Sequence, residues 1–314
     1  MNTKQSVAGL IQEAYNKLKA SDADGAAILL NKALDDEYNN EEIKHALMSI
    51  DWWIEHIAPA QKIKNSYEKG GFILAQFRQY YAFLDSLGSH YDACQYAVRR
   101  FVFSSALNCF EDLLGDGVNQ HDPGLLLLIG RCYKGIGNYD EALKYIEQAT
   151  HFKREDGEAL AELADVYALL GQETEAKLLF REAFFLNPDK IDLRGIESEM
   201  ITRLRERLIQ ERKGCREEEL REWMPVYGRL WGVLPVRRQL KQIEFGRLKQ
   251  SIFTLKAEYK SNPDRNATLK PRLINRYFWL IDYYEDKRED PDLIDEIKLE
   301  IKLTDPELYQ RYIQ

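Results

Sequence analysis

The sequence predicts an all-α protein, and three observations lead to that prediction. Leu, Ala, Glu, Lys, Arg and Gln are plentiful among the 314 residues, which include only 9 prolines and 18 glycines. A pattern of small and large side chains recurs with a period of 34 residues in the middle of the chain. No segment reads convincingly as a strand. With 45% hydrophobic residues, the chain is too apolar for general disorder, so we expect packed helices.

Residues 1–122 are expected to form a divergent helical region. Residues 7–40 hold a weaker copy of the repeating pattern, in which Ser21 takes the position of a glycine. A helix follows over 41–57, and a long aromatic helix over 66–87. So many rings could line a peptide groove, but packing between long helices is the simpler interpretation. The small and large positions retained in the weaker copy are Leu10, Ala14, Ala26, Leu30, Ala33 and Leu34.

The clearest repeat consists of residues 123–156 and 157–190. Small residues are expected where two helices approach closely, and large ones between neighbouring hairpins. A glycine at the end of each first helix suits the left-handed residue that closes a helix. Asp122 and Pro123 form a typical helix start. The aligned pairs are Ile129/Leu163, Gly130/Ala164, Tyr133/Tyr167, Gly137/Gly171, Ala142/Ala176, Ile146/Phe180 and Ala149/Ala183.

This pattern resembles the tetratricopeptide repeat (TPR) family over residues 123–190, about a fifth of the chain. The resemblance implies a helical-hairpin solenoid, here with additional divergent N- and C-terminal helices. It also implies that the first helices line a groove for a partner peptide or helix. Some family members hold chaperone tails with a Lys/Asn/Arg clamp, from which this sequence departs. The implied groove residues are Leu127, Arg131, Lys134, Glu158, Ala161, Asp165 and Ala168.

Residues 191–314 are expected to form a C-terminal helical region without the repeat. We expect helices over 189–212 and 216–231, the latter interrupted by Pro225. Another should run from Pro235 to about Lys260, followed by one over 268–288 and short helices near Pro291 and Pro306. The apolar residues expected to form one buried stripe along the helix from Pro235 are Val236, Leu240, Ile243, Leu248, Ile252, Leu255 and Tyr259.

Positive charge is concentrated in residues 237–276. Eleven basic residues and three acidic ones give this segment a net charge of +8, which leaves −16 for the rest of the chain. The segment could be a solvated helix face balanced by the acidic C-terminal tail, which is the favoured interpretation. It could also dock an acidic protein or contact nucleic acid. The residues chosen as the candidate basic patch are Arg237, Arg238, Lys241, Lys249, Lys256 and Lys260.

No catalytic pattern is found in the sequence. A phosphate-binding glycine loop, a dinucleotide fingerprint and a nucleophile elbow are all missing. His90 and Cys94 are four residues apart, but a zinc site needs further ligands and none is nearby. We therefore expect no enzyme activity, no metal and no other cofactor.

The sequence favours a cytoplasmic location. Its four cysteines are thinly spread, with no Cys-x-x-Cys pair, which suits a reducing compartment. Residues 1–5 lead into a mixed polar helix rather than a signal peptide. The densest apolar stretch, 125–129, is far shorter than the roughly 20 residues that span a bilayer.

These observations together predict a non-enzymatic scaffold or adaptor that binds another protein through the repeat groove. Two alternatives stay open. One is a regulator that contacts nucleic acid through the basic segment 237–276, although the acidic pI near 5.4 argues against it. The other is a subunit that self-associates, because the exposed ends of a repeat array tend to stick together.

Overall fold

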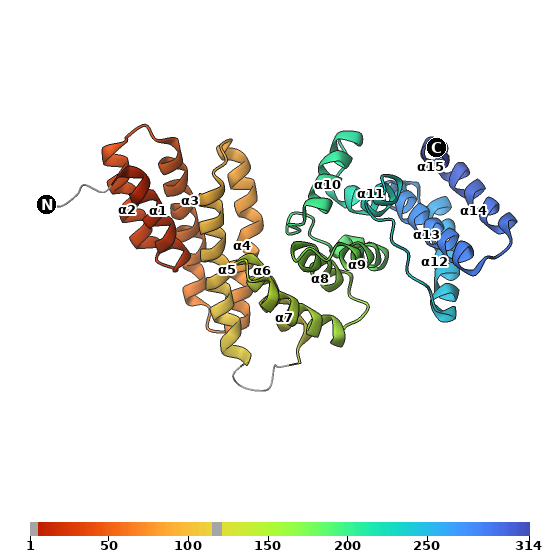
Figure 1. Ribbon diagram of the computed structural model, residues 1–314, viewed down its shortest axis with the longest axis horizontal. Helices are drawn as coiled ribbons and strands as arrows, with labels where there is room; N and C mark the ends of the chain where they lie inside the picture. The colour runs from red at the N-terminus through yellow and green to blue at the C-terminus, as the bar shows by residue number, and fades with distance from the viewer. Residues whose placement is uncertain (1–5, 115–120) are drawn as a thin grey trace. The chain divides into compact units, whose positions relative to one another are not determined.

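The computed structural model describes residues 6–114 and 121–314 (Figure 1). Within these ranges all regular structure is helical, with α-helices α1 to α15 and three short 3₁₀-helices, η1 to η3. The predicted all-α fold is therefore confirmed. Residues 1–5, where no signal peptide is expected, lie outside the described residues. By internal packing the chain forms two compact units, residues 1–152 and 153–314.

The first unit contains seven of the α-helices. The α1–α2 hairpin occupies the segment with the weaker repeat pattern, and its turn residue Ser21 has a φ of 65°. A left-handed serine explains why glycine is the usual residue at that position. The helices of this unit are α1 (Val7–Lys19), α2 (Ala23–Asp36), α3 (Glu41–Ile57), α4 (Ser66–Leu87), α5 (Asp92–Leu114), α6 (Pro123–Gly135) and α7 (Tyr139–Phe152), with η1 (Ala58–Lys62) after α3.

Aromatic side chains join α3, α4 and α5 inside this unit. The rings of Trp53 and Tyr80 are fully buried, with centroids 5.1 Å apart. Phe77 on α4 meets Phe103 on α5 edge to face at 5.1 Å. Such ring pairs stabilise a core beyond the area that they bury. The aromatic helix over 66–87 thus packs the core, as the simpler interpretation predicted.

The hairpin α6–α7 follows the expected repeat closely. The Asp122 side chain accepts hydrogen bonds from the backbone N–H groups of Gly124 and Leu125, at 2.8 and 3.3 Å. This cap satisfies donors that the first turn of a helix leaves unpaired. Gly137 closes α6 with a φ of 84°. Each local signal in the sequence therefore has its expected structural role.

The second unit joins the second repeat to all the C-terminal helices. One hydrophobic core runs from Leu160 and Phe180 of the repeat to Ile301 and Leu308 near the C-terminus. The repeat hairpin therefore does not fold apart from the helices that follow it. The elements are α8 (Gly157–Leu169), α9 (Glu173–Leu186), η2 (Pro188–Lys190), α10 (Glu199–Glu211), α11 (Glu217–Leu230), α12 (Gln242–Ser261), η3 (Pro263–Arg265), α13 (Asn266–Lys287), α14 (Pro291–Thr304) and α15 (Pro306–Ile313).

The helix predicted over 189–212 is wrong in its first half. Residues 191–198 form no regular helix, and α10 begins only at Glu199. Ile191, Leu193 and Ile196 are buried from this irregular segment. Their spacing of two and three residues would not place them on one face of a helix, and these side chains fill the core from a segment of turns.

Two further boundaries differ from the prediction. Pro225 does not interrupt α11, which runs unbroken from Glu217 to Leu230. The missing N–H removes one helical hydrogen bond, while the flanking Met224 and Val226 are completely buried. The helix predicted from Pro235 begins only at Gln242.

The segment before α12 is held in place by long-range contacts. The Val236 carbonyl accepts a hydrogen bond from Arg181 Nη1 at 2.8 Å, and Leu240 is buried in the core. Helical geometry would break these contacts, so the segment stays irregular. Ile243 was predicted in the buried stripe, but its side chain is exposed.

Close packing within the first repeat gives a test of the fold. A Cβ atom added at Gly130 would lie 2.3 Å from Ile146 Cγ1 and 3.3 Å from the Ala142 carbonyl oxygen. We expect Gly130→Ala to lower the free energy of unfolding of this unit by about 1–3 kcal/mol, because the crowded core must shift. Urea unfolding followed by circular dichroism measures the change.

Gly71→Ala is the matched control. A Cβ atom there meets nothing within 4 Å, so the substitution adds helix propensity without a clash. It should raise the free energy of unfolding by about 0.5–1 kcal/mol. Equal stability of the two variants would contradict the packing described for α6 and α7.

Candidate functional site

The first-helix residues predicted to line the groove are divided between the two units. Leu127, Arg131 and Lys134 lie on α6 in the first unit. The Lys134 side chain is not widely exposed, since only 4% of the residue is accessible, and Leu127 is also largely buried. Arg131 is half-buried. Of these three positions, Arg131 is therefore the one that offers most of its surface.

The remaining four predicted groove residues lie on α8 in the second unit. Ala161 and Asp165 are buried, while Glu158 and Ala168 are half-buried. Glu158 stands in the first turn of α8, where a carboxylate interacts favourably with the helix dipole. The binding of a partner by these residues stays a prediction, with Glu158 and Ala168 as the more accessible pair.

Asp165 has a structural task within its own unit. Its carboxylate accepts hydrogen bonds from the backbone N–H groups of Glu197 and Ser198, at 3.0 and 2.8 Å. Ser198 is the N-cap residue of α10, so this carboxylate lies at the positive end of that helix. Asp165 thereby fixes the point at which the chain leaves the irregular segment and enters α10.

Several residues of the predicted basic patch form ion pairs within the second unit. Arg237 Nε lies 3.2 Å from Asp282, and its Nη1 lies 2.5 Å from Glu285. Arg238 pairs with Glu244 at 2.8 Å. Lys256 on α12 pairs with Glu300 on α14 at 2.7 Å. These three cations are partly neutralised by the chain itself.

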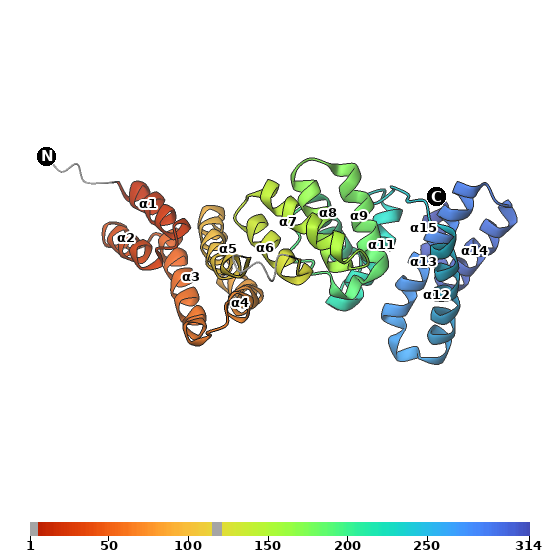
Figure 2. The same ribbon diagram turned by 90° about the horizontal axis from the view of Figure 1, so that it is seen from below.

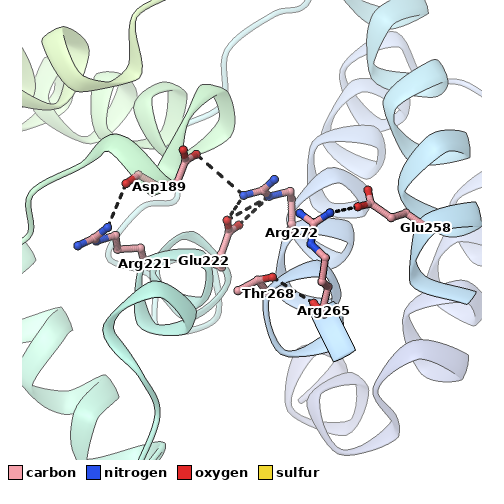
Figure 3. Close-up of polar contacts among 7 residues, drawn as sticks. All are labelled: Asp189, Arg221, Glu222, Glu258, Arg265, Thr268 and Arg272. Atoms are coloured by element: carbon pink, nitrogen blue, oxygen red, sulfur yellow. Dashed lines mark hydrogen bonds and ion pairs between the residues drawn. The ribbon is translucent and has the colours of Figure 1, made fainter. Parts of the chain in front are cut away.

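The same is true of basic residues farther along the segment (Figure 3). The Arg272 guanidinium binds the largely buried Glu222 carboxylate and lies 4.0 Å from Asp189. Arg265 forms an ion pair with Glu258. The first contact ties α13 to α11, and the second ties the N-cap residue of α13 to α12. Most of the local excess of positive charge therefore works inside the fold.

The remaining patch residues, Lys241, Lys249 and Lys260, have exposed side chains. None of them forms an ion pair within the described part of the chain, and the ammonium of Lys249 lies 5.5 Å from the centre of the Phe245 ring. Lys241 precedes α12, and its backbone N–H donates to Glu244 Oε2 at 2.7 Å. Only these members of the predicted patch keep solvated charges.

Sequence reasoning missed a buried cluster of three arginines around Asp282. Arg181 forms an ion pair with this carboxylate, Arg229 Nη2 lies 2.8 Å from it, and Arg237 contacts it at 3.2 Å. Only 5% of the Asp282 residue is exposed. Burial lowers the pKa of Arg181, and the Asp282 charge opposes that shift. The available signal was a lone acid within the apolar run 277–284 of α13.

The cluster predicts unequal effects for its members. Asp282→Asn should reduce the free energy of unfolding of the second unit by about 3–5 kcal/mol, because it leaves arginines buried without a counter-charge. Arg237→Gln is the control, since 48% of the Arg237 side chain is exposed, and its loss should be below about 1 kcal/mol. Similar losses in guanidinium-induced unfolding of the two variants would argue against a buried, shared carboxylate.

The first unit contains a buried histidine. Both ring nitrogens of His45 are enclosed, and its ring meets that of Tyr91 at 5.2 Å. Burial, with a smaller effect from the charge of His90, lowers the pKa of His45 below its ordinary value of 6.5. His45 is therefore neutral in the folded protein at pH 7.

This pKa shift predicts a pH dependence. As pH falls below about 6.5, the unfolded chain binds a proton at His45 more readily than the folded chain does. The free energy of unfolding of the first unit should therefore be lower at pH 5.5 than at pH 7.5, and His45→Phe should weaken this dependence. Urea titrations at both pH values provide the measurement, and an unchanged pH dependence in His45→Phe would contradict the prediction.

The described residues offer little that could support catalysis. Burial raises the pKa of Cys94 to about 12 and that of Cys215 to about 11, so these thiols are poor nucleophiles. All four cysteines are free thiols. No group of three or more His, Cys, Asp or Glu side chains within the described ranges could hold a metal ion. None of the described helices combines the length and apolar character needed to cross a bilayer.

Comparison with known proteins identifies the two central hairpins. Residues 123–156 and 157–190 each match the family model of the tetratricopeptide repeat. These segments contain the pairs α6–α7 and α8–α9. No curated protein matches the chain significantly.

Proposed function

Because these two repeats make the chain a tetratricopeptide-repeat protein, we propose that it is a non-enzymatic cytoplasmic scaffold or adaptor that binds another protein. The observation that carries this proposal is the pair of consecutive matched hairpins, a fold used for interaction with proteins. Four free thiols are in keeping with a reducing compartment.

The partner segment would bind to the first helices of the two repeats. Arg131 gives α6 a positive charge for this contact, Glu158 gives α8 a negative one, and Ala168 adds a small apolar position on α8. An extended peptide or a helix could contact each of these helices through a charge of the opposite sign. Asp165 contributes less to binding, because its carboxylate already holds the start of α10.

The internal ion pairs weigh against nucleic acid as the partner. A phosphate backbone would compete with Glu285, Glu244, Glu300 and Glu222 for the arginines and lysine that these carboxylates neutralise. The basic segment therefore serves better as part of the fold. The sequence favoured a solvated face balanced by the acidic tail, but of these four carboxylates only Glu285 belongs to that tail.

A charge-reversal experiment tests the proposed surface. The double variant Arg131→Glu, Glu158→Lys reverses one half-buried charge on each first helix and keeps the net charge. Proteins captured from cytosol by the wild-type chain should be recovered about tenfold less well, since the loss of one charged hydrogen bond costs about 1.5–3 kcal/mol. Quantitative mass spectrometry of the captured proteins measures this.

The matched control changes the second helices instead. Lys144→Glu, Glu175→Lys reverses the same two charges on the exposed surfaces of α7 and α9. This variant should retain the partners, and both variants should unfold at the wild-type temperature. If both variants recovered every partner equally well, the first helices would not be the binding surface.

A further inference from the structure

The outward face of α12 carries exposed apolar side chains that no other described residue covers. Ile243 and Phe253 are 73% and 77% exposed, and they lie on the same side of the helix as Gly246, Gln250 and Ala257. The steps of three and four residues between these positions keep them on one face. The opposite face holds the core residues Leu248, Ile252 and Leu255. One face of α12 therefore packs into the core, while the solvent-facing side of the same helix carries two large apolar side chains.

Gly246 leaves a notch between the two large side chains. A Cβ atom added there would meet no other atom within 4 Å, so the space above this residue is open. Ile243 lies nearly one turn before the notch, and Phe253 lies two turns after it. Side chains from another helix could enter this space and cover both.

The charges beside the stripe are positive. Lys249 and Lys260 are exposed, and Arg247 pairs only with the equally exposed Glu155, at 3.1 Å. The two carboxylates of α12 bind cations of the same chain, Glu244 with Arg238 and Glu258 with Arg265. A partner for this stripe should therefore be apolar in its centre and acidic at its edge.

The outward face of α14 has that complementary chemistry. Leu299 and Leu303 are exposed one helical turn apart, the latter to 73%. Asp292, Asp295 and Glu296 are exposed on the turns that precede them, and Asp295 stays 70% exposed although Lys298 Nζ lies 3.0 Å from it. Both α12 and α14 pack against α13 within the second unit (Figure 2).

We propose that the α12 stripe of one copy of this chain docks against the α14 face of a second copy. The antiparallel arrangement matches the two surfaces. It places Leu303 over the notch at Gly246 and Leu299 one turn farther along α12, so that Asp295 and Glu296 lie between Lys249 and Lys260. Because the two docking surfaces differ, a pair of copies leaves one α12 stripe and one α14 face unoccupied. Further copies can bind to these surfaces, so the contact builds rings or chains.

This self-association is independent of the proposed peptide-binding surface. It uses α12 and α14, whereas the repeats would bind a partner through α6 and α8. An assembled form would multiply the repeat surfaces, so that several weak contacts to one partner could add up. Failure of one proposal therefore leaves the other intact.

Sedimentation velocity on the full chain tests the contact. The sedimentation coefficient of the wild type should rise with concentration. Lys249→Glu, Lys260→Glu should weaken association at least tenfold, and so should Asp295→Lys, Glu296→Lys, because each variant places like charges across the contact. Phe253→Ser should weaken it as well, and the unfolding temperatures should show that all variants remain folded.

Mixing the two charge variants provides the decisive control. Each variant repels its own copies, but every contact between one variant and the other again joins opposite charges, so the mixture should associate like the wild type. A wild type that stays monomeric at all concentrations, or a mixture that does not recover, would overturn the proposal. Capture of a foreign protein through Phe253 by a monomeric chain would assign the stripe to that protein instead.

Discussion

A buried carboxylate shared by three arginines is the interaction on which the second unit depends. Asp282 of α13 contacts Arg181 from the second repeat, Arg229 from α11 and Arg237 from the segment before α12. The Arg181 guanidinium also lies 4.8 Å from the centre of the Trp279 ring. Burying Arg181 and Asp282, whose side chains are each 5% exposed, is favourable only while both charges are present. The cluster thus connects the repeat to helices up to 101 residues away in sequence.

This connection reduces the surface of the second repeat that is exposed. A repeat in a long array is flanked by further repeats, but here α8 and α9 share one core with α10 to α15. Asp165, expected in the groove, holds the start of α10 by two backbone hydrogen bonds. The surface left for recognition is smaller than the repeat pattern alone suggests, and Glu158 and Ala168 remain its more accessible positions in this unit.

Local signals predicted most of the helices. The capping residue Asp122 and the left-handed Gly137 act within a few residues of their own position, so the sequence reveals them directly. The irregular segments 191–198 and 235–241 were predicted as helix because the sequence does not show the distant contacts that hold them, such as that of Arg181 with the Val236 carbonyl. For the same reason, the contacts that groove and basic-patch residues make within the fold were not predicted. Neither the backbone contacts of Asp165 nor the partners of the arginines could be inferred from spacing.

Hydrogen exchange measured by mass spectrometry, comparing wild type with Asp282→Asn, tests most directly whether the second repeat and the C-terminal helices form one cooperative unit. If they do, peptides from α8, α9, α11 and α13 should lose protection together in the variant, while those from α1 to α5 keep it. The repeat would instead be an independent hairpin if α13 alone lost protection and α8 and α9 exchanged as in the wild type. That outcome would contradict a shared core organised around Asp282.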